Sequence, residues 1–432
     1  MSVTSSQPSG TSSRTAEATR GEVEACLRAG IHAVYQPIVD LATRETIAFE
    51  ALARPPAGAA FESPGPLFAA AKRVGLVAEL DFACRRAAIE GAASLPPGAT
   101  LFVNIEPEVI GATPPEQHAS LFESAPDGLH VVLEITERAL TDRTPELLVA
   151  VEAARAAGRS IAIDDVGTNP EAVALLPFVR PDVLRIDGSL VQGGAGRKAA
   201  YVAVAVRAYA EQTGAMVLAE CIEDAAHLDA ALAFGATAGQ GWLFGRPGPI
   251  PAGTALHSSV RRLTLPALEH AATSPFCALR AAGAEPRVAT HAVVKAIGRQ
   301  LESEAIVCVG RPVVLSSFQS AQRFSEVTEH YDSLGHRCAF VAAFGVGIDP
   351  APTPAVRGIP IVADDVLADE WAVVVTGPRF QGALVARDMG DPGGGDGRRY
   401  EFVVTHEAGL VQAAVESLMR RVVASARGHR LS

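Results

Sequence analysis

The sequence lacks several features that would decide its class at once. No apolar run approaches the roughly 20 residues that a membrane-spanning helix needs, and residues 1–21 contain no apolar segment of the kind found in secretory signals. Long blocks of Lys and Arg are also missing, and the net charge of the 432 residues is −11. We therefore expect a cytoplasmic protein that neither enters a membrane nor binds a nucleic-acid duplex, because duplex binding depends on basic contacts to phosphate.

Paired cysteines are lacking too. The six cysteines are scattered, and none forms a C-x-x-C pair, which argues against a thiolate zinc site and favours reduced, buried side chains. Apolar residues make up 48% of the chain and charged residues 20%, so a sizeable core is available. At about 150 residues per domain, the length predicts two or three domains.

Composition along the chain suggests where these domains lie. We expect an unstructured leader over 1–21, a first domain over 22–250, a linker over 251–272, a second domain over 273–425 and a tail over 426–432. The linker is placed at the closely spaced Pro247, Pro249 and Pro251 and the polar, basic segment that follows them. No repeat of 20–50 residues is visible, which excludes a solenoid.

The first domain repeats one pattern, in which a short apolar run ends in an acid or amide and an amphipathic stretch follows. The residues at these run ends are Glu50, Asn104, Glu134, Asp164, Asp165, Asp187, Glu220 and Gln240, with Arg185 inside one of the runs. Buried parallel strands alternating with helices give this pattern. The length fits a TIM-like (β/α)8 barrel, and the predicted fold class is α/β, with a smaller α/β domain after the barrel.

In such a barrel the carboxyl ends of the strands meet at one mouth. Several carboxylates brought together there repel one another unless cations compensate them. Oxygen ligands without His or Cys favour the hard ions Mg²⁺ or Mn²⁺. An acid or amide after a strand is also a common helix N-cap, and capping alone would explain two or three of these positions. The sequence leaves both explanations open at each single position.

The motifs in this region resemble those of EAL-domain cyclic di-GMP phosphodiesterases. The similarity rests on the segments YQPIVDL (35–41), FEALAR (49–54), LEITE (133–137), DDVGT (164–168), LRID (184–187), AECIE (219–223) and QGWLFGRP (240–247). They follow one another in the family's order across 31–247. The resemblance implies a TIM-like barrel that hydrolyses one phosphodiester bond of cyclic di-GMP to linear pGpG, with two Mg²⁺ or Mn²⁺ ions, and it implies a homodimer.

The resemblance also implies roles for single residues. Metal ligands would be Glu50, Asn104, Glu134 and Asp164, with Asp165 and Glu220 holding a second metal or its water. Glu137 would anchor the loop after Asp165, and Glu223 would lie in the outer shell. Gln36, Arg54 and Gln240 would contact the substrate, since the forked donors of Arg54 suit a phosphate oxygen.

Some positions depart from the family pattern. Arg185 stands where the family usually has a lysine that orients or deprotonates the attacking water, and an arginine cannot act as a base. Val166 and Asn169 alter the loop after Asp165, while Glu106 replaces a serine-like residue and Cys221 replaces a glycine. We expect an intact metal site and a reaction slowed by Arg185.

The region 275–425 resembles the DICT sensory domain through Ser316-Ser317-Phe318-Gln319, Arg323-Phe324 and the segment around Tyr331. Runs at 306–309, 372–375 and 383–386 predict strands, and 410–422 predicts a helix with an apolar face. The histidines of this region show no metal-ligand spacing. The resemblance implies a regulatory domain that reads a signal or protein partner of unknown identity.

Three functions follow from these features. The leading one is a metal-dependent cyclic di-GMP phosphodiesterase that the C-terminal domain regulates. Arg185 and the altered loop favour a second, a catalytically inactive receptor that binds cyclic di-GMP and signals through protein contacts. The third is an interaction module that binds neither metal nor nucleotide. The retained acids argue against this module, because an unused acidic cluster would destabilise the fold through repulsion.

Overall fold

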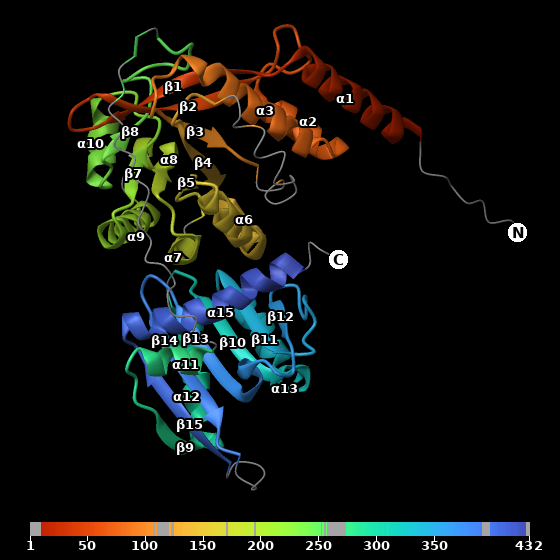
Figure 1. Cartoon of the computed structure of the whole chain (residues 1–432), viewed down its shortest axis with the longest axis vertical. Helices are drawn as coiled ribbons and strands as arrows, with labels where there is room; N and C mark the ends of the chain where they lie inside the picture. Colours follow the sequence, from red (N-terminus) through yellow and green to blue (C-terminus); the bar gives the residue numbers. More distant parts are fainter. Residues whose placement is uncertain are drawn as a thin grey trace, which may run out of the picture.

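The computed structural model of the chain contains a closed β-barrel followed by a second domain built on an open sheet (Figure 1). It describes residues 10–106, 109, 121, 125–169, 172–193, 196–251, 253–254, 256, 274–308, 310–390 and 398–428. Most of the predicted linker 251–272 therefore lies outside the described residues. The division into a barrel and a smaller α/β domain confirms the predicted fold class.

The barrel closes in the strand order β1 to β8. Its strands are β1 (His32–Asp40), β2 (Thr46–Arg54), β3 (Thr100–Asn104), β4 (His130–Thr136), β5 (Ser160–Val166), β6 (Val183–Ile186), β7 (Met216–Ala219) and β8 (Ala238–Gly239). β1 runs antiparallel to both β2 and β8, whereas the other neighbours are parallel. We expected all strands of the barrel to be parallel, and this expectation is wrong for β1. A short turn joins β1 to β2, and antiparallel strands need no crossover helix.

Apolar side chains fill the barrel and its outer layer. Within the barrel, Phe102, Val132, Ala162 and Leu218 form one buried cluster, so the interior is a packed core and not a pore. The surrounding helices are α2 (Pro64–Val74), α3 (Val77–Gly91), α5 (Glu137–Asp142), α6 (Thr144–Ala156), α7 (Leu176–Val179), α8 (Gly188–Gln192), α9 (Arg197–Thr213) and α10 (Ala225–Ala233), with short 3₁₀ turns η1 (Ala92–Ser94) and η3 (Ala172–Leu175). This packing fixes the strand ends that carry the polar residues.

Helix α1 (Gly10–Ala29) corrects the prediction of an unstructured leader over 1–21. The helix begins within that segment, and residues 1–9 lie outside the described residues. Val23 and Cys26 of α1 are buried in a cluster with Leu67 of α2, and the guanidinium of Arg20 donates to the carbonyl of Val74. Docking on α2 therefore stabilises a helix whose first half has no apolar pattern of its own.

The second domain has a seven-stranded sheet in the order β12-β11-β10-β13-β14-β15-β9. Its strands are β9 (Arg287–Thr290), β10 (Val313–Ser320), β11 (Phe340–Val346), β12 (Arg357–Ile361), β13 (Glu370–Thr376), β14 (Gln381–Asp388) and β15 (Arg399–Thr405). The pairs β10–β11 and β11–β12 are parallel, and the remaining pairs are antiparallel. The predicted strands at 372–375 and 383–386 are confirmed within β13 and β14.

Helices cover both faces of this sheet. They are α11 (Pro275–Ala281) and α15 (Ala408–Gly428) on one face and α12 (His291–Val307), α13 (Ala321–Ser325) and α14 (Thr328–Gly335) on the other, with the 3₁₀ turn η4 (Val366–Asp369). The strand predicted at 306–309 is wrong, because Ile306 and Val307 end α12, whose Leu301 and Ala305 are buried at helical spacing. α15 also continues to Gly428, so the predicted tail over 426–432 begins as helix.

Helix α15 lies between the second sheet and the barrel (Figure 1). Arg180 and Glu416 form an ion pair across this interface, and so do Glu152 and Arg427. On the barrel side of β12, Arg357 Nη2 lies 3.6 Å from Glu146 Oε1. These ion pairs join α6 and the end of α7 to α15 and β12, and apolar side chains of both domains belong to one buried cluster.

Candidate active site at the barrel mouth

The sheet register brings five of the predicted site residues close together on neighbouring strands. In the sheet register Asn104 is level with Glu134, Thr136 is level with Asp164, and Gln36 is level with Glu50. Parallel strands carry residues of the same register to the same end of a barrel. The acids on these strands therefore lie together at one mouth of the barrel, as expected.

The guanidinium of Arg185, on β6, lies at the centre of these acids. Its Nη2 is 3.2 Å from Glu50 Oε2, and its Nη1 contacts Glu134 Oε1. Its Nε is 2.7 Å from Glu220 Oε1 and 3.3 Å from Asp164 Oδ1. Arg185 is only 2% exposed. One buried cation thus faces four carboxylates from four different strand ends.

Two amides complete the surroundings of Glu50. Asn104 Nδ2 donates to Glu50 Oε1 at 2.9 Å, and Gln240 Nε2 donates to Glu50 Oε2 at 2.9 Å. Arg185 Nη2 in turn donates to Gln240 Oε1 at 3.3 Å. Gln240, expected to contact substrate, is therefore bonded inside the acidic cluster and holds Glu50 in place.

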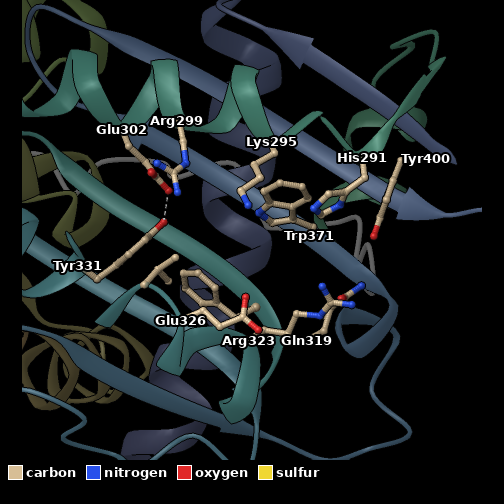
Figure 2. A pocket seen from close by; sticks show the side chains of 12 residues that line it. His291, Lys295, Arg299, Glu302, Gln319, Arg323, Glu326, Tyr331, Trp371 and Tyr400 are labelled. Carbon is tan, nitrogen blue, oxygen red and sulfur yellow. Dashed lines mark hydrogen bonds between the residues drawn. The ribbon is translucent and has the colours of Figure 1, made fainter. Parts of the chain in front are cut away.

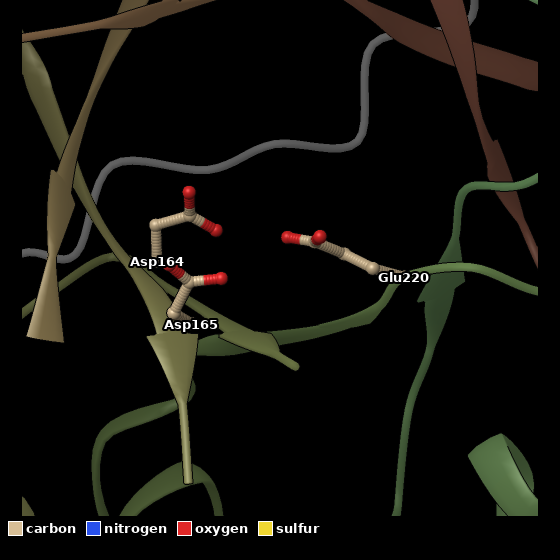
Figure 3. Close-up of side chains that lie close together, drawn as sticks. All are labelled: Asp164, Asp165 and Glu220. Carbon is tan, nitrogen blue, oxygen red and sulfur yellow. The ribbon is translucent and has the colours of Figure 1, made fainter. Parts of the chain in front are cut away.

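Asp164, Asp165 and Glu220 form a second grouping at the same mouth (Figure 3). One carboxylate oxygen from each lies within 4.8 Å of the others. Their burial raises the pKa of both aspartates, and repulsion by Glu220 adds to it; the pKa of Asp165 rises to about 6. Close carboxylates with raised pKa values are stabilised in their charged form by a cation.

The donor set fits a divalent metal. Oε2 of Glu134 is buried and accepts no hydrogen bond from any described residue, whereas Oε1 of Glu134 and Oδ1 of Asp164 have the guanidinium of Arg185 as their partner. Buried polar atoms without partners are costly, and carboxylate oxygens are the ligands that Mg²⁺ and Mn²⁺ prefer. The residues present therefore suit hard ions, although the guanidinium of Arg185 now occupies the side that Glu50 and Glu134 face.

The loop after Asp165 is held by Glu137, at the start of α5. Glu137 accepts hydrogen bonds from Gly167 N at 3.1 Å, Asn169 N at 2.7 Å and Thr168 Oγ1 at 3.1 Å. Asp165 has a φ of 59° and Gly167 a φ of 108°, conformations that suit glycine and are strained for other residues. The carboxylate therefore fixes a strained turn beside the acids, in the position expected for the loop anchor.

Three predicted residues lie at the edge of the cluster or outside it. Gln36 Nε2 donates to the carbonyl of Gly245 at 3.0 Å, and Arg54 Nη1 donates to the carbonyl of its neighbour Ala53 at 2.8 Å. Both belong to the hairpin β1–β2 next to Glu50. The side chain of Glu223 is exposed and makes no hydrogen bond or ion pair within the described part of the chain, so the structure does not bring it to the acids.

A buried ion pair that the sequence reasoning missed supports the segment after β3. Arg85 Nε donates to Asp81 Oδ2 at 2.6 Å, and Asp81 Oδ1 accepts from the backbone N–H of Glu106 at 2.9 Å. Asp81 is 2% exposed and Arg85 3%. The spacing of four residues in α3 was the available signal, but exposed pairs with this spacing are common.

Cys221 occupies a backbone position that suits glycine. Its φ is 54°, in the left-handed region where a side chain is unfavourable. A Cβ added to Gly188 would lie 2.6 Å from the Cys221 sulfur. The departure from the family's glycine thus places a thiol against α8, directly after Glu220.

None of the helices in the described part of the chain is long and apolar enough to cross a membrane.

A family model described as "EAL domain" matches residues 23–247. A second model, "Sensory domain in DIguanylate Cyclases and Two-component system", known as DICT, matches residues 277–389. The two matches coincide with the barrel and with most of the second domain.

Individual relatives cover parts of the chain. The protein y4lL of Sinorhizobium fredii is 31% identical over 229 residues, which is 51% of this chain and 27% of that protein. Cyclic di-GMP phosphodiesterase PdeF of Escherichia coli is 31% identical over 121 residues, 28% of this chain and 16% of PdeF. This chain thus spans well under half the length of either relative.

Solved structures resemble the same part of the chain. The calcium and cyclic di-GMP complex of BlrP1 from Klebsiella pneumoniae is 30% identical, covers 50% of this chain and 56% of that chain, and has a TM-score of 0.45. The match of the family model is longer, since residues 23–247 make up more than half of the 432 residues. Through its barrel, this chain belongs to the EAL domain family.

Proposed function

We propose that the barrel binds cyclic di-GMP and hydrolyses one of its two phosphodiester bonds in a reaction that requires divalent metal ions. The convergence of Glu50, Glu134, Asp164 and Glu220 on one mouth carries this proposal. The name of the relative PdeF supports cyclic di-GMP as the substrate. The product is linear pGpG: one P–O bond breaks, the phosphate gains the oxygen of water, and the released ribose hydroxyl gains a proton.

Two ions, Mg²⁺ or Mn²⁺, are part of the proposal. Glu50, Asn104, Glu134 and Asp164 would hold one, and Asp165 and Glu220 would share the second with Asp164. When bound, such ions lower the pKa of water and offset the charge that develops on the phosphoryl oxygens. Among the residues of the chain, Gln36 and Arg54 on the β1–β2 hairpin would contact the substrate and orient its phosphate.

The part played by Arg185 follows from its chemistry. Its guanidinium keeps its proton in proteins, so it cannot remove a proton from water. It can donate hydrogen bonds and stabilise negative charge at the mouth. Metal binding by Glu50 and Glu134 requires that Arg185 release them, and we therefore propose that turnover is slow.

A receptor without turnover is the second candidate, and Arg185 favours it. A buried guanidinium that contacts four carboxylates compensates their charge without any ion. In that case the barrel would bind cyclic di-GMP at the same mouth and signal through protein contacts. The two candidates differ in whether the P–O bond breaks, and not in the ligand.

One experiment separates these candidates. Purified full-length protein is incubated with cyclic di-GMP and Mg²⁺ or Mn²⁺, and linear product is followed by chromatography. Binding is measured in parallel with Ca²⁺. Product formation supports the phosphodiesterase, whereas binding without product supports the receptor. Failure of both would reject the two candidates together.

We further propose that the second domain regulates the barrel. The match to a sensory domain supports a regulatory role, and the ion pairs Arg180–Glu416 and Glu152–Arg427 provide a direct connection between the domains. A homodimer and a cytoplasmic location are proposed from the resemblance and the composition. Activity measured with and without residues 274–432 tests regulation, since a rate that does not depend on the second domain would contradict it.

A further inference from the structure

The second domain contains a cavity of about 110 Å³ between helix α12 and the opposite wall formed by β10, α13 and α14 (Figure 2). The aromatic rings of Trp371, Tyr400 and Phe318 form its floor. The cationic side chains of Lys295, Arg299 and Arg323 form its rim. Several of the residues that resemble the DICT domain line it, namely Phe318, Gln319, Arg323 and Tyr331. The barrel mechanism uses none of them.

Three cationic side chains line the cavity without forming an ion pair in the described part of the chain. Lys295 and Arg299 lie one turn apart on the face of α12 that borders the cavity, and Arg323 lies on the opposite side (Figure 2). Within the described residues, none of these three side chains forms an ion pair. Like charges at this spacing repel one another on a helix. An anion bound between them would relieve this repulsion.

The acids at the cavity do not supply that anion. Glu302, which is 7% exposed, accepts from Tyr331 Oη at 2.5 Å and lies 2.8 Å from His330 Nε2. Its carboxylate is thus already bonded to Tyr331 and His330. Glu326 lines the cavity as well, but one exposed acid does not balance three cations. The open side of the cavity keeps a positive charge.

The floor offers flat apolar surfaces on two sides. On one side Trp371 and Tyr400 pack edge to face with their ring centres 6.2 Å apart, and the ring of His291 lies 5.5 Å from Trp371. On the other side Phe318 and Tyr331 pack edge to face at 4.8 Å. Aromatic rings bind further rings with these geometries. The cavity therefore suits a flat, unsaturated molecule.

The backbone is distorted at the cavity. Gln319 has a φ of 62°, and the pairing of β10 with β11 shifts register between Ser317 and Ser320. A bulge of this kind redirects side chains, and a left-handed backbone conformation is unfavourable for a residue other than glycine. The strain places the amide of Gln319 on the cavity wall opposite Lys295 (Figure 2). Strain maintained in this way is typical of binding sites.

We propose that this cavity binds a small organic anion, an aromatic carboxylate with a single ring. The ring lies on the floor against Trp371 and Phe318, and the carboxylate lies at the rim between Lys295, Arg299 and Arg323. The cavity of about 110 Å³ is somewhat smaller than a dry cavity of about 150 Å³ that accommodates benzene, so part of the molecule would extend through the open rim. Cyclic di-GMP, with two guanine bases, is too large.

Benzoate is the probe, and Trp371 reports its binding. The chain has two tryptophans, so the full-length variant Trp242→Phe leaves Trp371 as the single indole. Titration with benzoate is expected to change its fluorescence saturably. Benzyl alcohol, with a ring and no charge, and acetate, with a charge and no ring, are both expected to bind at least about tenfold more weakly, a loss of about 1.4 kcal/mol.

Two substitutions identify the site. In the Trp242→Phe background, Lys295→Met and Arg299→Met are each expected to weaken benzoate binding about tenfold. Arg280→Met is the matched control, because Arg280 is exposed on α11 at the other face of the sheet. All three positions are exposed, and unfolding temperatures verify that each variant is folded.

The proposal is overturned by any of several results. These are no saturable change at millimolar benzoate, equal binding of benzyl alcohol, equal weakening by Arg280→Met, or a Trp371 response to cyclic di-GMP in place of benzoate. The readout is binding in the second domain, so a barrel without turnover would leave the test unaffected.

Discussion

The guanidinium of Arg185 is bound directly to the carboxylate of Glu220, with 2.7 Å between Nε and Oε1. Arg185 has 2% of its surface exposed, so this contact and its contacts to three further acids are shielded from solvent. Interactions between charges are strengthened in such surroundings. Arg185 therefore acts as an internal counter-charge, and a divalent ion has to compete with it for the same carboxylates.

Arg185→Lys is expected to raise the rate of cyclic di-GMP hydrolysis. Lysine presents a compact charge with fewer fixed donors, so the carboxylates are released more easily. A misplacement of about 1 Å costs up to ~100-fold in rate, which sets the upper limit of the gain. Linear product measured by chromatography checks it, with Arg207→Lys on the exposed side of α9 as the control. An unchanged rate would mean that this position does not limit turnover.

Arg185→Met is expected to make the stability of the barrel depend on metal. Removing one partner from a buried ion pair typically costs about 3–5 kcal/mol, because the remaining acids lose their compensation. Added Mn²⁺ or Ca²⁺ should restore much of the unfolding temperature of the variant, whereas chelator should have a smaller effect on the wild type. Unfolding followed by calorimetry with and without each ion provides the comparison. Equal metal dependence in both proteins would show that Arg185 does not take the place of a cation.

Glu50→Ala is expected to abolish metal-dependent turnover. Glu50 receives hydrogen bonds from Asn104, Gln240 and Arg185, so its loss removes a proposed ligand and disrupts its neighbours. Product formation at saturating Mn²⁺ is the measurement. Glu62→Ala, an exposed acid on the same domain, should keep its activity. If Glu50→Ala retained turnover, the proposed metal-dependent reaction at this site would be contradicted.

The positions of the acids were predictable because they depend on the backbone alone. Continuous apolar runs predicted the strands of the barrel, and an acid at the end of each run has to lie at the same mouth once those strands are parallel. The central position of Arg185 was not predictable in this way. It depends on side-chain dihedral angles and on the mutual repulsion of acids from four strands, neither of which a strand pattern contains.

Other differences between the predicted and the observed elements arose where tertiary contacts determined the local structure. The segment 306–309 has a β-prone composition, yet Ala305 and Leu301 bury the preceding turns of α12 and the helix continues to Val307. In the same way, contacts of Val23 and Cys26 with α2 help to stabilise the helix α1. The aromatic cavity of the second domain joins residues from six elements, so no single stretch of sequence could have indicated it.

Glu137→Gln is expected to change the pH dependence of stability. Burial raises the pKa of Glu137 to about 7, against the hydrogen bonds from Asn169, Gly167 and Thr168 that lower it. A carboxyl whose pKa is raised by folding stabilises the folded state fully below its unfolded pKa of about 4.5 and loses this contribution as the pH rises through about 7. The free energy of unfolding of the variant should therefore lack this decline between about pH 4.5 and about pH 7.

Denaturant unfolding of wild type and variant across that pH range measures the difference, since other groups contribute equally to both proteins. Glu90→Gln, on the exposed side of α3, is the control and should follow the wild type. Parallel curves for wild type and Glu137→Gln would show that Glu137 is charged throughout this range.

Glu370→Ala is expected to destabilise the second domain by about 3–5 kcal/mol. Glu370, at the start of β13, has none of its surface exposed. Its carboxylate accepts from Ser274 Oγ at 2.5 Å, from the backbone N–H of Phe276 at 3.0 Å and from Arg387 Nη2 at 2.8 Å. The substitution leaves the N-terminus of α11 and the guanidinium without their acceptor.

Chemical denaturation of the full chain, followed through Trp371 in the Trp242→Phe background, measures this loss because Trp371 directly follows Glu370 in β13. Glu285→Ala, at an exposed position of the same domain, should change stability by less than about 0.5 kcal/mol. A similarly small effect of Glu370→Ala would mean that α11 stays attached through its apolar contacts alone. In that case Phe276 and Leu279, both buried against the sheet, would be the residues that hold α11.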